Sequence, residues 1–302
     1  MSKISGLTLI EILIAIVIST LMMAAMFTSY SIVNSTYRQV TDRAKISQAG
    51  RDVVGQILRE VRMAGFKYFN DNIAAHDSHI PIKITKRKGF QDAAGKDPSL
   101  REEVGCDTIE IVYGGVDYDS KQADVDKRYT YTRYKIKYWC EASDKIENIN
   151  DKSRIKGFKV LKSFEKWNGT TFTSVVSPKD NRLYEREQVL DYVQDMVFVP
   201  LDKDGKRIDA DSSGKYSNTQ IVPSDGKEYD VRTIDIGLIV RSTKPFYRDD
   251  TKAGAIRKII SLTSGRDISE QDKYLRDIIT VTANARNIGL DKWTKKMKAV
   301  LL

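Results

Sequence analysis

The sequence predicts an α+β protein in which one long N-terminal helix precedes an antiparallel, β-rich globular head. Three observations predict this. The chain of 302 residues begins with a short polar leader, and an almost wholly apolar run follows it. Apolar residues then recur at helical spacing as far as residue 65. From residue 66 onward, short alternating stretches separated by turn residues are typical of strands.

The apolar run from Leu7 to Tyr30 is long enough, as a helix, to cross a bilayer. At about 1.5 Å per residue it spans roughly 36 Å. Glu11 is the one charged residue within it. An ionised group in the hydrocarbon region costs about 2.5–3.5 kcal/mol even on lenient insertion scales, so such a residue usually has a partner and a function.

Three interpretations of this N-terminal segment compete. An ordinary secretory signal needs a small-residue cleavage site after a short apolar region, and the alanines at positions 24 and 25 offer a poor one. An uncleaved anchor with its basic leader in the cytoplasm explains the length of the run but not Glu11. Cleavage between Gly6 and Leu7 would leave a new α-amine four residues before Glu11. Such an amine can compensate the carboxylate, on the same chain or on a neighbour.

The motif Gly6-Leu-Thr-Leu-Ile-Glu11, with the apolar run behind it, resembles the class III signal of type IV pilins and type II secretion pseudopilins. The resemblance implies that a prepilin peptidase cuts after Gly6 and methylates Leu7, and that Glu11 is the assembly carboxylate. It also implies a type IV pilin-like fold. Major pilins usually have Phe where this chain has Leu7, a substitution common among minor members. The expected parts are the leader (1–6), a transmembrane half of the helix (7–30), an amphipathic half (31–65) and the head (66–302).

Along the chain, the helical spacing predicts one helix from about Leu7 to Met63, with Gly65 just past its end. In the head, residues 108–113 alternate as a strand expected to stop at Gly114-Gly115, and 129–140 form a long strand expected to pair with it. The remaining expectations are a hairpin of 158–164 and 171–176 around Asn168-Gly169, a short helix at 185–193, strands at 196–201, 231–241 and 276–286, and loops at 89–103 and 205–228.

Two cysteines, Cys106 and Cys140, are the only ones in the sequence. If the anchor places the head outside the cytoplasm, a disulfide between them is plausible. It would contribute about 3–4 kcal/mol in the chain-entropy model. Pairing of the strands at 108–113 and 129–140 would bring the two residues near each other. The alternative is a pair of buried free thiols.

Charge and motifs argue against catalysis. The 50 basic and 41 acidic residues, a net charge of +9, are finely interspersed, which is typical of a solvated surface. Contact with DNA or anionic lipid stays open, but no dense basic block indicates it. No nucleophile elbow, phosphate loop or metal-ligand cluster is present. We therefore expect no enzyme activity, no cofactor and no metal.

Three segments have a functional alternative beside a structural one. Four carboxylates could form a calcium-binding loop: Asp202, Asp204, Asp209 and Asp211. Their spacing does not match the EF-hand pattern, and an Asp-Gly turn is the structural alternative. The aromatic residues of 129–139 fit a stacking platform or a packed strand. The basic C-terminal segment 293–302 has the spacing of a short helix that docks on its own head, a neighbour or a membrane.

Further stretches resemble PilW-type minor pilins. The segments that carry this resemblance are 48–51, 58–66, 193–197, 202–205, 234–242 and 276–287. It implies a minor pilin that helps to initiate type IV pilus assembly in a tip or priming complex. Its partners would be other minor pilins, the major pilin, the prepilin peptidase and the inner-membrane assembly platform. The protein would sit in the inner membrane as a single-pass precursor with a periplasmic head, and then in the fibre. The alternatives are a J-type pseudopilin of type II secretion and a tip adhesin or DNA-binding subunit.

Overall fold

The computed structural model describes residues 8–66, 81–86, 106–143, 157–174, 182–208, 221–222, 231–243, 246, 257–262, 268–270 and 274–288. The chain forms two compact units, Met1–Lys45 and Ile46–Leu302. The predicted fold class, a long N-terminal helix followed by an antiparallel β-sheet head, is confirmed.

The N-terminal helix α1 runs from Leu9 to Met63 and is 55 residues long. Both ends lie within two residues of the predicted ones. Gly65 has a φ of 72°, the left-handed conformation that glycine supplies just past a helix C-terminus. The backbone N–H of Gly65 donates to the carbonyl of Val112, 2.9 Å away, so the end of the helix is tied directly to the sheet.

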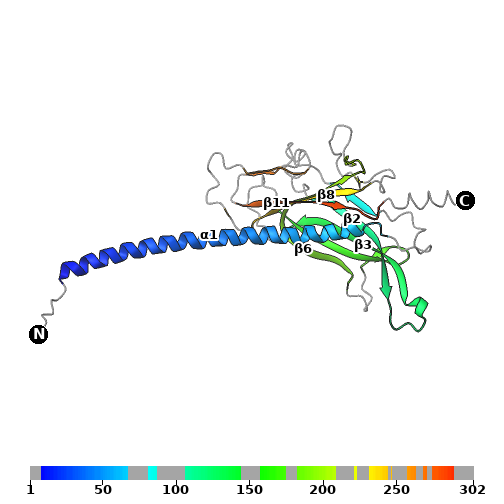
Figure 1. The fold of residues 1–302 in the computed structure, drawn as a ribbon, viewed down its shortest axis with the longest axis horizontal. Coiled ribbons are helices and arrows are strands. Elements are labelled where there is room, and N and C mark those ends of the chain that lie inside the picture. Colours follow the sequence, from blue (N-terminus) through cyan, green and yellow to red (C-terminus); the bar gives the residue numbers. More distant parts are fainter. Residues whose placement is uncertain are drawn as a thin grey trace. The chain divides into compact units, whose positions relative to one another are not determined.

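The strands of the second unit form one nine-stranded antiparallel sheet and a separate pair (Figure 1). In the larger sheet the order is β11-β8-β6-β4-β3-β2-β1-β7, with β5 paired to β4. The bounds are β1 (Ile82–Thr85), β2 (Thr108–Tyr118), β3 (Tyr129–Ala142), β4 (Phe158–Trp167), β5 (Phe172–Thr173), β6 (Tyr184–Leu201), β7 (Ile221–Val222), β8 (Thr233–Arg241) and β11 (Arg276–Asn284). The pair is β9 (Arg257–Ile259) with β10 (Ile268–Glu270), and a 3-10 turn, η1 (Val125–Lys127), lies between β2 and β3.

Within the second unit, the last part of α1 packs on one face of the larger sheet. Val53, Val54, Ile57 and Val61 are buried in a single hydrophobic core. The strands contribute alternate residues to the same core, which is the period expected of a sheet with one face packed on a helix. The contributing strand residues include Ile109, Ile111, Ile136, Tyr138, Ile234, Ile236, Leu238 and Val240.

The predicted end of the strand at Gly114-Gly115 is wrong, because β2 continues through both glycines to Tyr118. A Cβ atom on Gly115 would lie 2.3 Å from Cε2 of Tyr134 on the neighbouring strand. This glycine therefore leaves room for an aromatic ring across the ladder and does not form a turn. The pairing of β2 with β3 is as predicted, with Ile109 opposite Tyr138 and Ile111 opposite Ile136.

The helix predicted at residues 185–193 is also wrong, because these residues belong to β6. The pairing of β6 with β4 shifts register three times between Phe158 and Phe164, and its pairing with β8 shifts between Val193 and Asp195. Tyr192, just before the shift in the pairing with β8, has a positive φ of 59°. Each shift breaks the alternation of side chains, so this strand lacks the period of two that would have identified it.

The predicted strands at 158–164, 196–201, 231–241 and 276–286 are confirmed, and of the one predicted at 171–176 the structure shows Phe172–Thr173. The hairpin around Asn168 and Gly169 joins β4 to β5, and the predicted strands at 231–241 and 276–286 are β8 and β11. The predicted loop at 89–103, most of the loop at 205–228, and the C-terminal segment 293–302 lie outside the described residues. In the described part of 205–228 the prediction is wrong at 221–222, because these two residues form β7, which pairs with β1.

Candidate functional site

The first turn of α1 places Glu11 in a reciprocal hydrogen-bonded cap with Thr8. The Glu11 carboxylate accepts the backbone N–H and the hydroxyl of Thr8, each at 2.8 Å from Oε2. The backbone N–H of Glu11 in turn lies 3.4 Å from Oγ1 of Thr8. This is the arrangement of a capping box, in which the N-cap side chain and a carboxylate three residues later satisfy each other's free N–H groups.

The cap gives Glu11 a partner on its own chain at the positive end of the helix dipole. Thr8 was not among the predicted functional residues. A Thr followed three residues later by a Glu, directly before an apolar run, is the sequence signal that identifies such a cap. Gly6 and Leu7 lie outside the described residues, so the geometry of the predicted cleavage point is not described.

Behind the cap, the first part of α1 is apolar and exposed. Within the described residues, α1 is the one helix long and apolar enough to cross a membrane, and its most apolar stretch is not buried. No charged residue lies between Glu11 and Arg38. The hydroxyls of Ser19, Thr20 and Thr28 donate to helix carbonyls one turn back, at 2.7–2.9 Å. These three hydroxyls are thus satisfied within the helix, as a hydrocarbon environment requires.

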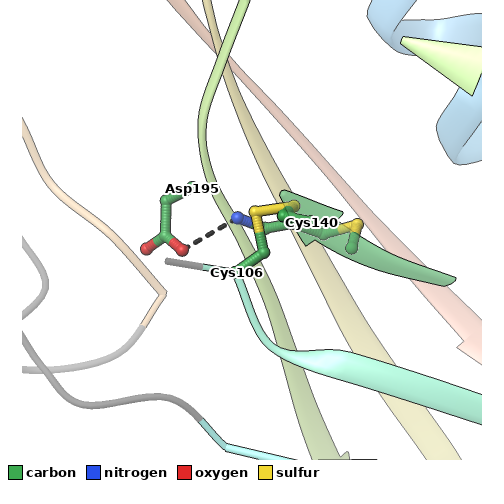
Figure 2. Close-up of a disulfide and its surroundings, with 4 residues drawn as sticks. Cys106, Cys140 and Asp195 are labelled. Atoms are coloured by element: carbon green, nitrogen blue, oxygen red, sulfur yellow. Dashed lines mark hydrogen bonds between the residues drawn. A yellow bond between two sulfur atoms is a disulfide. The ribbon is translucent and has the colours of Figure 1, made fainter. Parts of the chain in front are cut away.

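The predicted pairing of the cysteines is present in the second unit. Cys106, just before β2, forms a disulfide with Cys140 in β3, with the two Cα atoms 5.6 Å apart. The bond closes a loop of sequence separation 34 that contains β2 and most of β3. Figure 2 shows it together with Asp195 of β6, whose carboxylate accepts the backbone N–H of Met196 at 2.8 Å.

A buried ion pair lies next to the disulfide in the chain. Lys86 and Asp107 are 1% and 0% exposed, and Nζ of Lys86 is 2.9 Å from Oδ2 of Asp107. Lys86 also donates to the carbonyl of Phe198, while the N–H of Phe198 donates to Asp107 at 3.1 Å. Together with Phe198, the pair joins the end of β1, the start of β2 and the C-terminal part of β6. The sequence gives no signal that this lysine and this aspartate are buried.

A second buried pair lies between α1 and the sheet. Lys162 of β4 is 2.7 Å from Oε1 of Glu60 on α1, and both side chains are largely buried. Burial lowers the pKa of Lys162, but the hydrogen bond and the negative charge of Glu60 outweigh burial, so the pKa lies above its ordinary value. Burial, followed by the charge of Glu60, raises the pKa of Tyr113 to about 12. The same two causes raise the pKa of Tyr138.

The predicted alternatives for calcium and aromatic stacking find no support in the described residues. Oδ1 of Asp202 accepts the N–H groups of Asp204 and Lys206, each at 2.8 Å, and Gly205 follows with a φ of 74°. The bond from Lys206 is the largest cause that holds the pKa of Asp202 below its ordinary value. The described residues contain no group of three or more metal-ligating side chains, while Asp209 and Asp211 lie outside them.

In β3 the aromatic residues divide between the two faces of the sheet. Tyr138 is buried in the core that the sheet shares with α1, and Tyr134 is buried beside Tyr113 and Phe164, which pack against that core. Tyr129 is 53% exposed and pairs with the ring of Tyr118, 5.2 Å away between ring centroids. The aromatic residues of β3 therefore cannot form one continuous stacking platform.

Comparison with known proteins assigns the N-terminal segment. Residues 1–27 match the prokaryotic N-terminal methylation motif. No curated protein gives a significant match. Among solved structures, the chain is similar to a type IV-like pilin from Thermus thermophilus at 12% identity and a TM-score of 0.42, over 80% of this chain and 98% of that one. The methylation motif and the apolar helix that follows it support membrane anchoring.

Proposed function

We propose that this protein is a minor pilin of the PilW type, a low-copy subunit that helps to initiate type IV pilus assembly. The observation that carries the proposal is the methylation motif at residues 1–27, whose single carboxylate caps a helix that continues without a break to Met63. The segments similar to PilW-type subunits support the choice of branch. The activity is binding and assembly, and no catalysis is part of it.

In this proposal the peptidase cuts between Gly6 and Leu7, and Glu11 changes partner during assembly. Before assembly, Thr8 satisfies the carboxylate, as the capping box does in the described helix. In the fibre, the methylated amine of Leu7 on a neighbouring subunit compensates it. A carboxylate among apolar helices is stable only where such a cation lies close, so Glu11 sets the axial register of the incoming subunit.

The proposed route runs from the inner membrane to the fibre. The precursor spans the inner membrane once, with residues 7–30 in the bilayer and the head in the periplasm. The Cys106–Cys140 disulfide supports an oxidising compartment for the head, because disulfides persist there and are rare in the cytosol. The partners are the prepilin peptidase, the inner-membrane assembly platform, the major pilin and other minor pilins in a tip or priming complex.

A J-type pseudopilin shares the signal, the helix and the general plan. The similarity of residues 58–66 to the PilW-type helix end favours the pilus branch. Neighbouring genes for pilus biogenesis support that branch, and neighbouring genes for type II secretion components contradict it.

The test of processing is mass spectrometry of the protein extracted from membranes. We expect a mature N-terminus at Leu7 that carries one methyl group, and an intact Met1 in wild-type protein would contradict the proposal. Gly6→Val is the matched control, because a β-branched residue at the cut should leave the leader in place. The test of the pilus role is fibre number in a deletion strain, which should fall and recover with the wild-type chain.

A further inference from the structure

Strand β11 forms one edge of the nine-stranded sheet. All nine of its residues, Arg276–Asn284, pair with β8 on one side. Within the part of the chain that the structure describes, no strand pairs with the other side. The edge of a sheet presents unpaired backbone N–H and C=O groups, which are a template for another extended chain.

The bonds at the two ends of β11 decide which residues point outward. The N–H of Ser242 donates to the carbonyl of Leu275, and the N–H of Ala285 donates to the carbonyl of Arg232, at 2.7 and 2.9 Å. In an antiparallel ladder, alternate residues bond to the same neighbour, so the odd-numbered residues of β11 bond to β8. The outward backbone groups are those of Ile278, Thr280, Thr282 and Asn284.

The outward edge is accessible and regular. The side chains of Thr280, Thr282 and Asn284 are exposed, while those of Ile279 and Ala283 are buried against the core. The exposed side chains are held by β8: Oγ1 of Thr282 donates to Asp235 at 2.7 Å, and Oγ1 of Thr233 donates to Asn284 at 3.2 Å. The strand is therefore fixed in an extended form, and no described strand pairs with its outer backbone groups.

A second edge of the same sheet shows the usual protection. β8 pairs with β6 only from Val193 onward, so the first half of β6 forms an edge in the described residues. That half contains Glu185-Arg186-Glu187-Gln188, all exposed. Charged side chains of this kind are what natural proteins place on edges to prevent pairing. In contrast, β11 has no charged side chain from Ile278 to its end, and the uncharged run continues to Ala285.

We propose that the outer edge of β11 binds an extended strand of a different protein subunit, which adds a tenth strand to the sheet. Backbone hydrogen bonds to Ile278, Thr280, Thr282 and Asn284 would give the affinity. The partner strand is uncharged at its centre, to match the uncharged run. A second copy of this chain fits less well, because Arg276 and Arg286 flank the run. In an antiparallel self-pair, these cations at the two ends would lie beside those of the other copy.

The test is site-specific photo-crosslinking of the full-length protein in the cells that naturally produce it. A photoreactive phenylalanine analogue replaces Thr280 in one sample and Thr282 in a second, and Gln188 on the charged edge of β6 in a control. We expect one adduct of the same partner from both β11 positions, and at least fivefold less from Gln188. Mass spectrometry should place the two cross-links on one strand of the partner, about two residues apart.

That two-residue displacement is the signature of strand addition, which non-specific proximity does not produce. Absence of an adduct at both β11 positions, equal adducts at Gln188, or cross-links only to a second copy would overturn the proposal. Thr282→Lys should lower the Thr280 cross-link at least fivefold, while an unchanged disulfide and unfolding midpoint show that the head is folded. The N-terminus is determined in the same sample, so failed processing and failed strand addition are distinguishable.

Discussion

The two parts of α1 follow one sequence pattern but lie in different surroundings. In the first part, Val33, Tyr37 and Val40 recur at helical spacing and are 66%, 70% and 62% exposed. In the second part, Val54, Ile57 and Val61 recur in the same way and are at most 1% exposed. The first set belongs to the unit that ends at Lys45, and the second set belongs to the head.

Helical spacing of apolar residues therefore predicts that a helix has an apolar face, but it does not predict what covers that face. The head covers the second part of the helix in its own chain. In the first part, which carries the methylation motif and the stretch able to cross a membrane, Val33, Tyr37 and Val40 are exposed. We therefore expect the second part of the helix to stabilise the head. In the proposed function, the first part inserts into the membrane and takes part in assembly.

The two parts of the helix should differ most in how an alanine substitution changes the free energy of unfolding of the head. Ile57→Ala should lower the free energy of unfolding of the head by about 2–5 kcal/mol, because it leaves a cavity in a fully buried site. Val40→Ala should change it by less than about 0.5 kcal/mol. Denaturant unfolding of the full chain in detergent, followed by tryptophan fluorescence, measures both. Equal losses would show that the head also depends on the exposed part.

The disulfide offers the next contrast. Replacing Cys106 and Cys140 together by serine should destabilise the head by about 3 kcal/mol. Without the disulfide the unfolded chain has no closed loop, so its conformational entropy is higher. The helical signal of the first part of α1 in detergent should stay unchanged. Circular dichroism during denaturant unfolding separates the two. A loss of helicity in parallel with the head would contradict the division into two units.

Two glycines on the helix provide a finer test. A Cβ on Gly50 would lie 2.3 Å from Cδ1 of Ile279, whereas a Cβ on Gly55 would meet nothing within 4 Å. Gly50→Ala should therefore destabilise the head by about 1 kcal/mol after its gain in helix propensity. Gly55→Ala should stabilise it by about 0.5–1 kcal/mol. Stabilisation by both would mean that the helix does not approach β11 so closely.

Alkaline pH should weaken the contact between the second part of the helix and the sheet. The pKa of Tyr113 is raised to about 12, so the unfolded chain loses this proton from about pH 10 while the folded chain keeps it. The raised pKa of Lys162 acts in the same direction, since its pairing with Glu60 is fully present below the ordinary lysine pKa and lost above the folded one. The unfolding midpoint should fall between pH 10 and 12, and less so in Tyr113→Phe. A pH-independent midpoint in wild-type protein would contradict this.

Local signals predicted the helix well, because both of its ends depend on neighbouring residues. The capping box of Thr8 and Glu11 was equally predictable, although Glu11 was assigned a role and Thr8 was not. The errors in the sheet have long-range causes. Gly115 faces a ring from another strand, and the bulge at Tyr192 depends on pairing with β4 and β8. The buried pair of Lys86 and Asp107 depends on three strands meeting, which no local pattern encodes.

The assembly role of Glu11 is tested most directly by the amount of this chain in sheared surface fibres, measured relative to the amount in the membrane. We expect Glu11→Ala to reduce that ratio at least tenfold, because the incoming helix loses the carboxylate that sets its register. The unfolding midpoint of the head and the Cys106–Cys140 disulfide should stay unchanged, since Glu11 lies in the other unit. Incorporation of Glu11→Ala at the wild-type ratio would contradict the account.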